Sequence, residues 1–346
     1  MFDIISIGTA TRDVYLQSPF FKVLKDTKHL QKLGFPTGEA ECFAMGGKID
    51  ISDVFFTTGG GAVNTAVTFA RQKLKTGALI TVGNDKNGEE VLRELKREKV
   101  TPLAIVNKGQ QTGYSTILLS AGGERTILSY RDEDGNLTKK KIPFSRMQTK
   151  WAYIAPGTID IVTLTALVKQ LTTKKTLIAI NPSKHFISIG PRKLKPLLDN
   201  IKVVIMNREE ASYFTGVAYE KIETMFVKLH NKIPGIAVMT DGPHGVLVSD
   251  GFNIYKAGVF KEKKVVDRTG AGDAFGSAFI AGLIERGEEC RLGLCDKENI
   301  KYAIRLASAN ATSKVEHRGA KGGLLTAKEF ETSPRWKKLD IEVWPL

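Results

Sequence analysis

Short, fully apolar segments that alternate with longer helical patterns constrain the fold of this chain more than any other feature. The apolar segments are residues 4–7, 78–82, 152–155, 177–180, 203–206 and 236–240, and helical patterns include 62–72 and 89–97. Strands that are apolar along their whole length are typical of a parallel sheet covered by helices on both faces. No internal repeat or Pro/Gly-rich linker divides the 346 residues. We therefore predict one α/β domain over residues 1–346, with a mostly parallel sheet.

Two regions break this alternation. Residues 13–56 form a long insertion, and residues 112–131 have the pattern of a β-hairpin around the turn residues Gly122 and Gly123. Strands without helices between them do not easily extend a doubly wound sheet. We expect residues 14–58 and 112–133 to form a small β lid that excludes water from a site.

The charge balance restricts the partners. Lys+Arg 51 against Asp+Glu 37 gives a net charge of +14, which attracts anions in general, nucleic acid included. The basic residues are scattered and are not interleaved with aromatic side chains, so a lysine-rich surface is favoured over a nucleic-acid groove. No apolar run is long enough to predict a membrane span. Cys42, Cys290 and Cys295 fit neither a disulfide framework nor a metal-binding spacing, which favours a cytoplasmic protein.

Residues 265–277 are the most informative segment. An apolar strand end leads into Gly270-Ala271-Gly272, which opens a helix that we expect to extend to about residue 284. The main-chain amides of this turn, together with the helix dipole, predict an anion pocket. Asp273 places a carboxylate beside it, where it can accept a proton from a hydroxyl that attacks a bound phosphate. The alternative is an ordinary Asp near a helix N-terminus.

Two common nucleotide motifs are absent from the sequence. No glycine loop ends in Gly-Lys-Ser or Gly-Lys-Thr, as a P-loop requires. Gly270, Gly272 and Gly276 are spaced one residue too far apart for the dinucleotide fingerprint, and they lie late in the chain. The P-loop and dinucleotide-binding classes are therefore disfavoured.

Three further segments carry polar groups beside predicted strands or helices. Gly59-Gly60-Gly61 precedes a helical pattern in which Asn64 can bind vicinal hydroxyls or merely cap the helix. Asp13 lies just past the first strand, as a ligand of a hydroxyl or as a solvent-facing loop residue. Asn207 and Glu210 follow the strand 203–206 and can hold hydrated Mg²⁺ or simply start a helix.

Together these segments resemble the ribokinase-like carbohydrate kinase family, the PfkB group. Gly59 to Asn64 is similar to its first signature, Asn207 to Glu210 to its N-x-x-E element, and Asp267 to Asp273 to its more specific second signature. The resemblance implies a three-layer α/β/α domain with a mostly parallel sheet and a small β-sheet lid. It also implies transfer of the γ-phosphoryl of ATP to a hydroxymethyl group of a small sugar.

The resemblance also implies a role for each matched residue. It makes Asp273 the general base and the amides of Gly270, Ala271 and Gly272 the anion hole. The implied acceptor site consists of Asp13, Gly60, Gly61 and Asn64. The implied Mg–phosphate site consists of Asn207 and Glu210, with Thr240 and Gly242 near the nucleotide. A monovalent cation, K⁺, would be bound by Asp267, the Thr269 carbonyl and Gly319. The implied cofactors are ATP and Mg²⁺. A homodimer formed through the lid is a further expectation.

This chain departs from the family pattern at two positions. Arg268 stands where a small residue is usual, and Lys73 replaces the usual glycine after the first signature's helix, which affects that turn more than catalysis. A catalytically idle sugar- or nucleotide-sensing module on the same fold is an alternative to the kinase.

The sequence leaves two chemical classes of acceptor possible. Arg131 resembles a lid arginine of fructokinase-like and ketodeoxygluconate-kinase-like members, which favours a keto or carboxylate sugar, unless it is a surface arginine closing the hairpin. A nucleoside kinase of the adenosine-kinase type is the alternative. Phe20, Phe21, Phe43 and Phe55 would then form walls for a base, and otherwise they form lid core.

Overall fold

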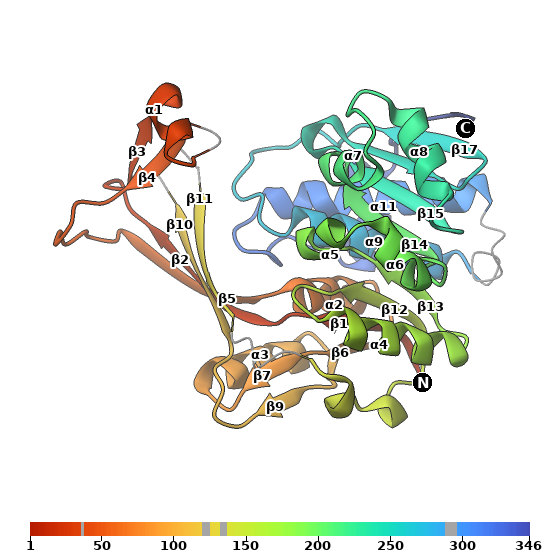
Figure 1. Ribbon diagram of the computed structural model, residues 1–346, viewed down its shortest axis with the longest axis horizontal. Helices are drawn as coiled ribbons and strands as arrows, with labels where there is room; N and C mark the ends of the chain where they lie inside the picture. The colour runs from red at the N-terminus through yellow and green to blue at the C-terminus, as the bar shows by residue number, and fades with distance from the viewer. Residues whose placement is uncertain (36–37, 120–124, 132–136, 288–295) are drawn as a thin grey trace.

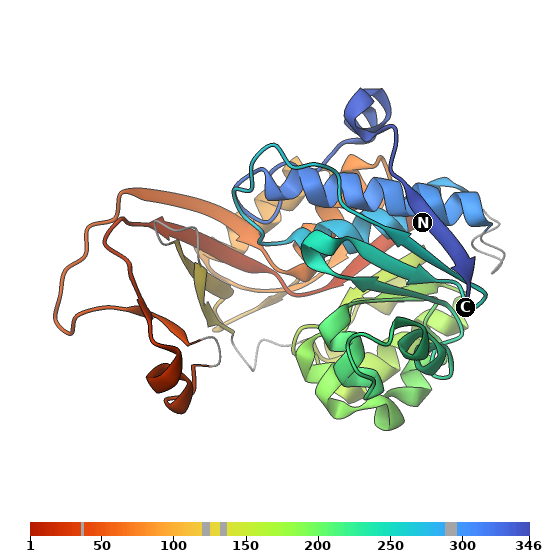
Figure 2. The same ribbon diagram turned by 90° about the horizontal axis from the view of Figure 1, so that it is seen from above.

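The computed structural model has three layers, with helices on both faces of a central sheet and a smaller sheet that extends away from this body (Figures 1 and 2). It describes residues 1–35, 38–119, 125–131, 137–287 and 296–346. Gly122, Gly123, residues 132–133 of the predicted lid, Cys290 and Cys295 lie outside the described residues. Cys42 is a free, exposed thiol. In the described ranges, no helix combines the length and apolar character needed to cross a membrane.

The central sheet has the predicted parallel arrangement, with an antiparallel extension at one edge. In the described chain its order is β18-β17-β16-β15-β14-β13-β12-β1-β6-β8. The strands are β1 (Phe2–Gly8), β6 (Thr76–Leu79), β8 (Thr101–Pro102), β12 (Thr149–Ala155), β13 (Leu177–Ile180), β14 (Val203–Asn207), β15 (Ile236–Thr240), β16 (Val246–Ser249), β17 (Asn253–Ala257) and β18 (Ile341–Pro345). Strands β8 to β15 pair in parallel, and β16, β17 and β18 pair antiparallel.

One predicted strand is divided in the structure. The apolar run 78–82 belongs partly to β6 and partly to β7 (Thr81–Gly83), which pairs with β9 (Ile105–Asn107) in a separate small sheet. Ile80 and Val82 are buried against α3 (Lys86–Arg97), so the apolar run continues although the chain changes sheets. Hydrophobic periodicity alone does not distinguish one continuous strand from two short strands that belong to different sheets.

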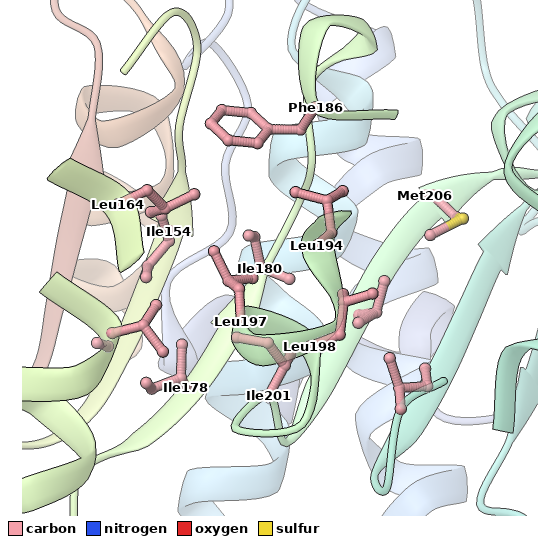
Figure 3. Close-up of a cluster of buried hydrophobic side chains, with 14 of the residues drawn as sticks. Ile154, Leu164, Ile178, Ile180, Phe186, Leu194, Leu197, Leu198, Ile201 and Met206 are labelled. Carbon is pink, nitrogen blue, oxygen red and sulfur yellow. The ribbon is translucent and has the colours of Figure 1, made fainter. Parts of the chain in front are cut away.

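Helices cover both faces of the sheet because its strands bury side chains on both faces. One face carries α4 (Ile161–Thr173), α5 (Lys184–Ile189), α6 (Pro191–Leu198), α7 (Arg208–Thr215) and α8 (Ile222–His230), and the other carries α2 (Gly61–Arg71), α9 (Ala271–Glu285) and α11 (Lys297–Val315), with α12 (Ala327–Thr332) beside them. Along β12, Ile154 packs into the first cluster, shown in Figure 3, whereas Tyr153 packs into the second. Short 3₁₀ turns lie at η1 (Lys139–Lys141), η2 (Phe144–Arg146), η3 (Gly242–His244) and η4 (Pro334–Trp336).

Three helices end in a left-handed lysine. Lys73, Lys99 and Lys175 have φ angles of 63°, 60° and 58°, and each follows a helix C-cap. After Lys73, the Leu74 amide donates to the Phe69 carbonyl at 3.1 Å, and the other two helices end in the same way. Glycine is usual at this position because a Cβ strains the left-handed conformation. Lys73 thus acts on its turn, as the sequence predicts.

Replacing such a lysine with glycine is therefore expected to stabilise the protein. Lys175→Gly should raise the free energy of unfolding by up to about 1 kcal/mol, because the strain removed exceeds the entropy that glycine adds to the unfolded chain. Lys174→Gly is the matched control, since Lys174 has an ordinary φ of −86°. Urea unfolding should show a higher midpoint for Lys175→Gly and a lower one for Lys174→Gly. Equal losses in both variants would contradict the assignment of strain.

The smaller sheet is the predicted lid region. Its order is β11 (Arg125–Tyr130), β10 (Gly113–Leu119), β2 (Thr11–Gln17) and β5 (Asp53–Gly59). The insertion adds β3 (Lys22–Lys25), α1 (Thr27–Lys32) and β4 (Glu39–Cys42), which lie at the far end of this sheet (Figure 1). The lid sheet therefore begins one strand after β1 and returns to the body at Gly59, directly before α2.

Candidate active site

The turn before α9 requires glycine at its start. Gly270 caps the helix with φ 79°, and a Cβ there would lie 2.8 Å from the carbonyl oxygen of Ala320. A Cβ on Gly272 would meet nothing within 4 Å, so this side of the first turn is open. The Ala271 amide donates to the Arg268 carbonyl at 3.2 Å. The amides of Gly272 and Asp273 have no intrahelical acceptor because the helix begins at Ala271, and they are available to an anion. This changes the predicted anion hole of Gly270, Ala271 and Gly272, because the Ala271 amide is already bound to Arg268 and the Asp273 amide is added.

Asp273 lies where the N-termini of α9 and α2 meet. Its Oδ2 accepts a hydrogen bond of 2.9 Å from the Asn64 side-chain amide. A Cβ on Gly61 would lie 3.9 Å from its Oδ1, so the glycine-rich loop approaches the carboxylate from the other helix. Burial raises the pKa of Asp273 from 3.8 to about 6, and the Asn64 hydrogen bond opposes this rise. A carboxylate that titrates near neutrality is suited to accept a proton.

The glycine-rich loop also contacts Asp13. This residue lies on strand β2, is 6% exposed, and accepts a hydrogen bond of 2.7 Å from the Thr11 hydroxyl. Any side chain at Gly59 would collide with the Asp13 carboxylate. Burial raises the pKa of Asp13, while Thr11 and more distant cations oppose the rise. Asp13 is therefore a buried strand residue of the lid sheet and does not lie in a solvent-facing loop.

A polar cavity lies between β1, the lid and β7. Its lining residues are Thr9, Ala10, Thr81, Val82, Gly83, Asn107, Gln110, Gln111, Gly113, Arg131 and Thr158. Arg131 is exposed at its rim and donates to the Tyr130 carbonyl at 2.8 Å. Thr9 connects this cavity to the glycine loop, because its Oγ1 accepts the Gly61 amide at 3.1 Å. Sequence reasoning missed Thr9, although polar residues at the carboxyl end of a parallel strand are a usable signal.

A second cavity, of about 200 Å³, opens beside the first turn of α9. It is lined by Thr240, Gly242, Pro243, Gly245, Val259, Glu262, Arg268, Ala271, Gly272, Phe275, Ser308, Ala311, Thr312 and Val315. The structure thus brings Thr240 and Gly242 together with the amides of the α9 turn, and it places Arg268 on the cavity wall. Sequence reasoning missed the α11 wall, because small residues at helical spacing have the same pattern as helix–helix packing.

Asn207 and Glu210 form a reciprocal cap at the start of α7. The Asn207 Oδ1 accepts the Glu210 amide at 2.7 Å, and the Glu210 Oε2 accepts the Asn207 amide at 2.9 Å. Asn207 is also paired in register with Thr240, which lines the second cavity. Burial raises the pKa of Glu210. In the described chain no three His, Cys, Asp or Glu side chains cluster as a metal site. These residues fit Mg²⁺ only as a largely hydrated ion held with phosphates.

The residues predicted for a monovalent cation lie together around one carboxylate. Asp267 Oδ1 accepts the Thr269 amide at 2.8 Å, and its Oδ2 accepts the Gly319 amide at 2.9 Å. A residue that sequence reasoning missed, Lys314, places its ammonium 3.9 Å from the same Oδ2. Burial lowers the pKa of Lys314 to about 8, and Asp267 opposes this fall.

The four insertion phenylalanines do not line either of these cavities. Phe21 is buried and packs edge-on against Phe43, at a centroid distance of 5.6 Å. Phe55 contacts the Tyr15 ring at 5.9 Å and lies beside Gly319, whereas Phe20 is 60% exposed. These side chains therefore pack within the lid region or are exposed, and they form no wall of the polar cavity.

Comparisons with known proteins give the family. The model of the pfkB family of carbohydrate kinases matches residues 39–327. A ribokinase of Lactococcus lactis is 28% identical over 296 residues, which cover 84% of this chain and 90% of that protein. The solved ribokinase of Giardia lamblia has a TM-score of 0.77 at 18% identity, with 95% and 97% of the two chains covered. An adenosine kinase of Sinorhizobium meliloti has a TM-score of 0.75 at 18% identity, with 96% and 99% covered.

This chain belongs to the PfkB family of carbohydrate kinases. The predicted ribokinase-like fold is confirmed by these structural neighbours. The chain is therefore an enzyme, a phosphotransferase with an alcohol group as acceptor.

Proposed function

We propose that this enzyme transfers the γ-phosphoryl group of ATP to a hydroxymethyl group of a small sugar. The observation that carries the proposal is the position of Asp273 in the first turn of α9, directly after Ala271 and Gly272 of the second cavity and hydrogen bonded to Asn64 of α2. The loop before α2 reaches the polar cavity through Thr9, whose hydroxyl accepts the Gly61 amide. The second cavity suits the nucleotide, because Phe275 and Val315 offer apolar surface to a base and the α9 amides face its phosphates. The first cavity is only about 40 Å³, so its polar lining suits one end of the acceptor and does not enclose it.

The side chains support one sequence of events. Asp273 accepts the proton of the acceptor hydroxyl while that oxygen bonds to the γ-phosphorus and the bond to the β-phosphate oxygen breaks, releasing ADP. The side-chain amide of Asn64 donates to the Asp273 carboxylate, and among the described residues its Oδ1 is buried without a hydrogen-bond partner, so it can accept from a second hydroxyl. The amides of Gly272 and Asp273 stabilise charge on the transferred group. Mg²⁺ would neutralise phosphate charge beside Glu210.

The polar lining of the acceptor cavity favours a sugar over a nucleoside. Among the described residues, the cavity presents Thr, Asn, Gln and Arg side chains but no aromatic ring that could stack on a base. Asp13 and Asn64 do not belong to this lining, but they can bind vicinal hydroxyls, which ribose and fructose both offer. A nucleoside acceptor is the second candidate, because a cytidine kinase of Thermococcus kodakarensis is 37% identical over 134 residues, although these cover only 47% of that protein.

A screen of acceptor-dependent ADP release tests the proposal. We expect release with a pentose, a ketohexose or a ketodeoxy acid, and slower release with cytidine or adenosine. Faster release with a nucleoside would overturn the sugar assignment. Stabilisation by ATP without ADP release from any acceptor would indicate a sensing module instead.

Arg131 is expected to select the acceptor. Its guanidinium lies at the rim of the polar cavity, where partial desolvation lowers its pKa and the charge of Asp13 opposes this fall. Arg131→Gln should raise KM for a keto or carboxylate sugar about tenfold, the scale of one lost charged hydrogen bond, with kcat little changed. Arg125 is exposed at the start of β11, the strand that ends just before Arg131, and gives a matched control in Arg125→Gln. Equal KM values for both variants would assign Arg131 to the surface.

We also propose that two copies associate through the lid. Phe56 and Leu128 on its edge strands β5 and β11 are 54% and 57% exposed. Exposed apolar side chains gathered on one small sheet are typical of an interaction surface. Sedimentation equilibrium should show a dimer, and Leu128→Lys should shift it toward the monomer.

A further inference from the structure

Lys314 is a fully buried lysine near the candidate anion hole. It lies in the last turn of α11, and none of its surface is exposed. Its ammonium donates to the main-chain carbonyl of Asp267 at 2.6 Å and to that of His317 at 3.2 Å, and the Asp267 carboxylate is 3.9 Å away. The ammonium therefore has a carboxylate and two carbonyl oxygens around it, as a buried charge requires.

This group of oxygens overlaps the set predicted to bind a monovalent cation. Asp267 belongs to that set, and His317 precedes the predicted Gly319 by two residues. A positive charge already lies among these oxygens, and it belongs to the protein itself. A second monovalent cation would lie beside a like charge in a buried environment, which is unfavourable. The residues present therefore do not fit a bound K⁺.

We propose that the Lys314 ammonium takes the place of a monovalent cation, so that this enzyme works without K⁺. Lys314 acts as a positioning residue for the anion hole and does not touch the substrate. It holds the Asp267 carbonyl, while the Asp267 carboxylate binds the amides of Thr269 and Gly319. The chain continues from Thr269 directly into Gly270 and the first turn of α9.

Main-chain hydrogen bonds fix the end of α11, and with it Lys314, against the segment before the α9 turn. The amides of Val266 and Asp267 both donate to the Val315 carbonyl, at 2.8 and 3.1 Å, so the end of α11 is fixed to the segment before the turn. A cation is also favoured at this end of a helix, where the last carbonyls carry partial negative charge. Removing the ammonium would take away the positive charge that these carbonyls contact and that lies beside the Asp267 carboxylate.

The test compares salts at equal ionic strength, by thermal unfolding and by kcat. Both salts are used at about 0.1 M, so that electrostatic screening is equal in the two solutions. Wild-type protein should have the same melting temperature and the same kcat in KCl as in choline chloride. Lys314→Ala opens the site. In choline chloride it should melt lower and lose about tenfold in kcat, and K⁺ or NH₄⁺ should restore both, whereas Li⁺ should not. Lys314→Met fills the site without charge and should not respond to K⁺.

Lys321→Ala is the matched control. Lys321 is also buried, and its ammonium binds the Thr58 carbonyl and hydroxyl near Glu94. Its loss should lower the melting temperature without any selective response to K⁺.

The ion response of the melting temperature needs no turnover, so it tests this proposal even if the proposed sugar kinase activity fails. Selective stabilisation or activation of the wild type by K⁺ would overturn the proposal. So would a folded Lys314→Ala that gives the same values in KCl and choline chloride. If Lys314→Ala does not fold in any salt, the wild-type comparison decides.

Discussion

Asp273→Asn is expected to lower kcat by about a thousandfold, because it removes the group that accepts the hydroxyl proton. Asn keeps the shape of the side chain and can still bind Asn64, so the turn at Gly270 and the nucleotide cavity should be preserved. The Kd for ATP, measured by isothermal titration calorimetry, should change less than threefold, roughly the effect of a substitution that disturbs no specific contact. A turnover near that of the wild type would reject Asp273 as the base.

The same variant should be more stable than the wild type at neutral pH. Burial raises the pKa of Asp273 from 3.8 to about 6 in the folded protein, so the folded state binds its proton more tightly than the unfolded chain. Its ionisation therefore costs stability as the pH rises from about 4 through 6, by up to about 3 kcal/mol. Asp273→Asn should melt higher at pH 8, and this gain should disappear below pH 4. A lower melting temperature at pH 8 would indicate that the variant disturbs the fold.

Gly270→Ala is expected to give the second-largest loss. The added Cβ would meet the Ala320 backbone at 2.8 to 2.9 Å in a left-handed conformation, so the turn must move. Strain and displacement together should cost about 3 kcal/mol of unfolding free energy. Displacing the donors of an anion hole typically lowers kcat by about a hundredfold or more.

Gly272→Ala is the matched control for folding. Its Cβ would meet nothing within 4 Å, so the fold should keep or gain stability from the better helix former. The two variants should therefore differ in urea midpoint, with Gly270→Ala the lower. Equal midpoints would contradict the close contact between Gly270 and Ala320.

The sequence predicts the site best where one short segment contains the whole arrangement. Asp273, Gly270 and Gly272 lie within four residues, and the turn and helix start follow from glycine and the strand before it. Asp13 and Asn64 were predicted by position, but the burial of Asp13 depends on its place in the lid sheet, which only the pairing of β2 with β5 and β10 establishes.

The rest depends on contacts between distant segments. Ser308 and Thr312 form part of a cavity wall only because α11 packs beside α9, and in the sequence they resemble any small helical residues. Lys314 is one of many lysines in a basic chain, and nothing near it in sequence indicates that its ammonium is buried against Asp267. For Asn207 and Glu210 the sequence leaves two interpretations, a helix start and a Mg²⁺–phosphate site. The two side chains cap α7, and Asn207 is also paired in register with Thr240 of the second cavity, so the two interpretations are compatible.

The pH dependence of kcat/KM tests the central claim most directly, because it reports the protonation state of the base in the free enzyme. For the wild type we expect kcat/KM to fall about tenfold per pH unit below a pKa of about 6, the value of Asp273. In Asp273→Asn the residual rate should show no such fall. A fall at the same pH in both proteins would show that another group accepts the proton, and it would contradict the account.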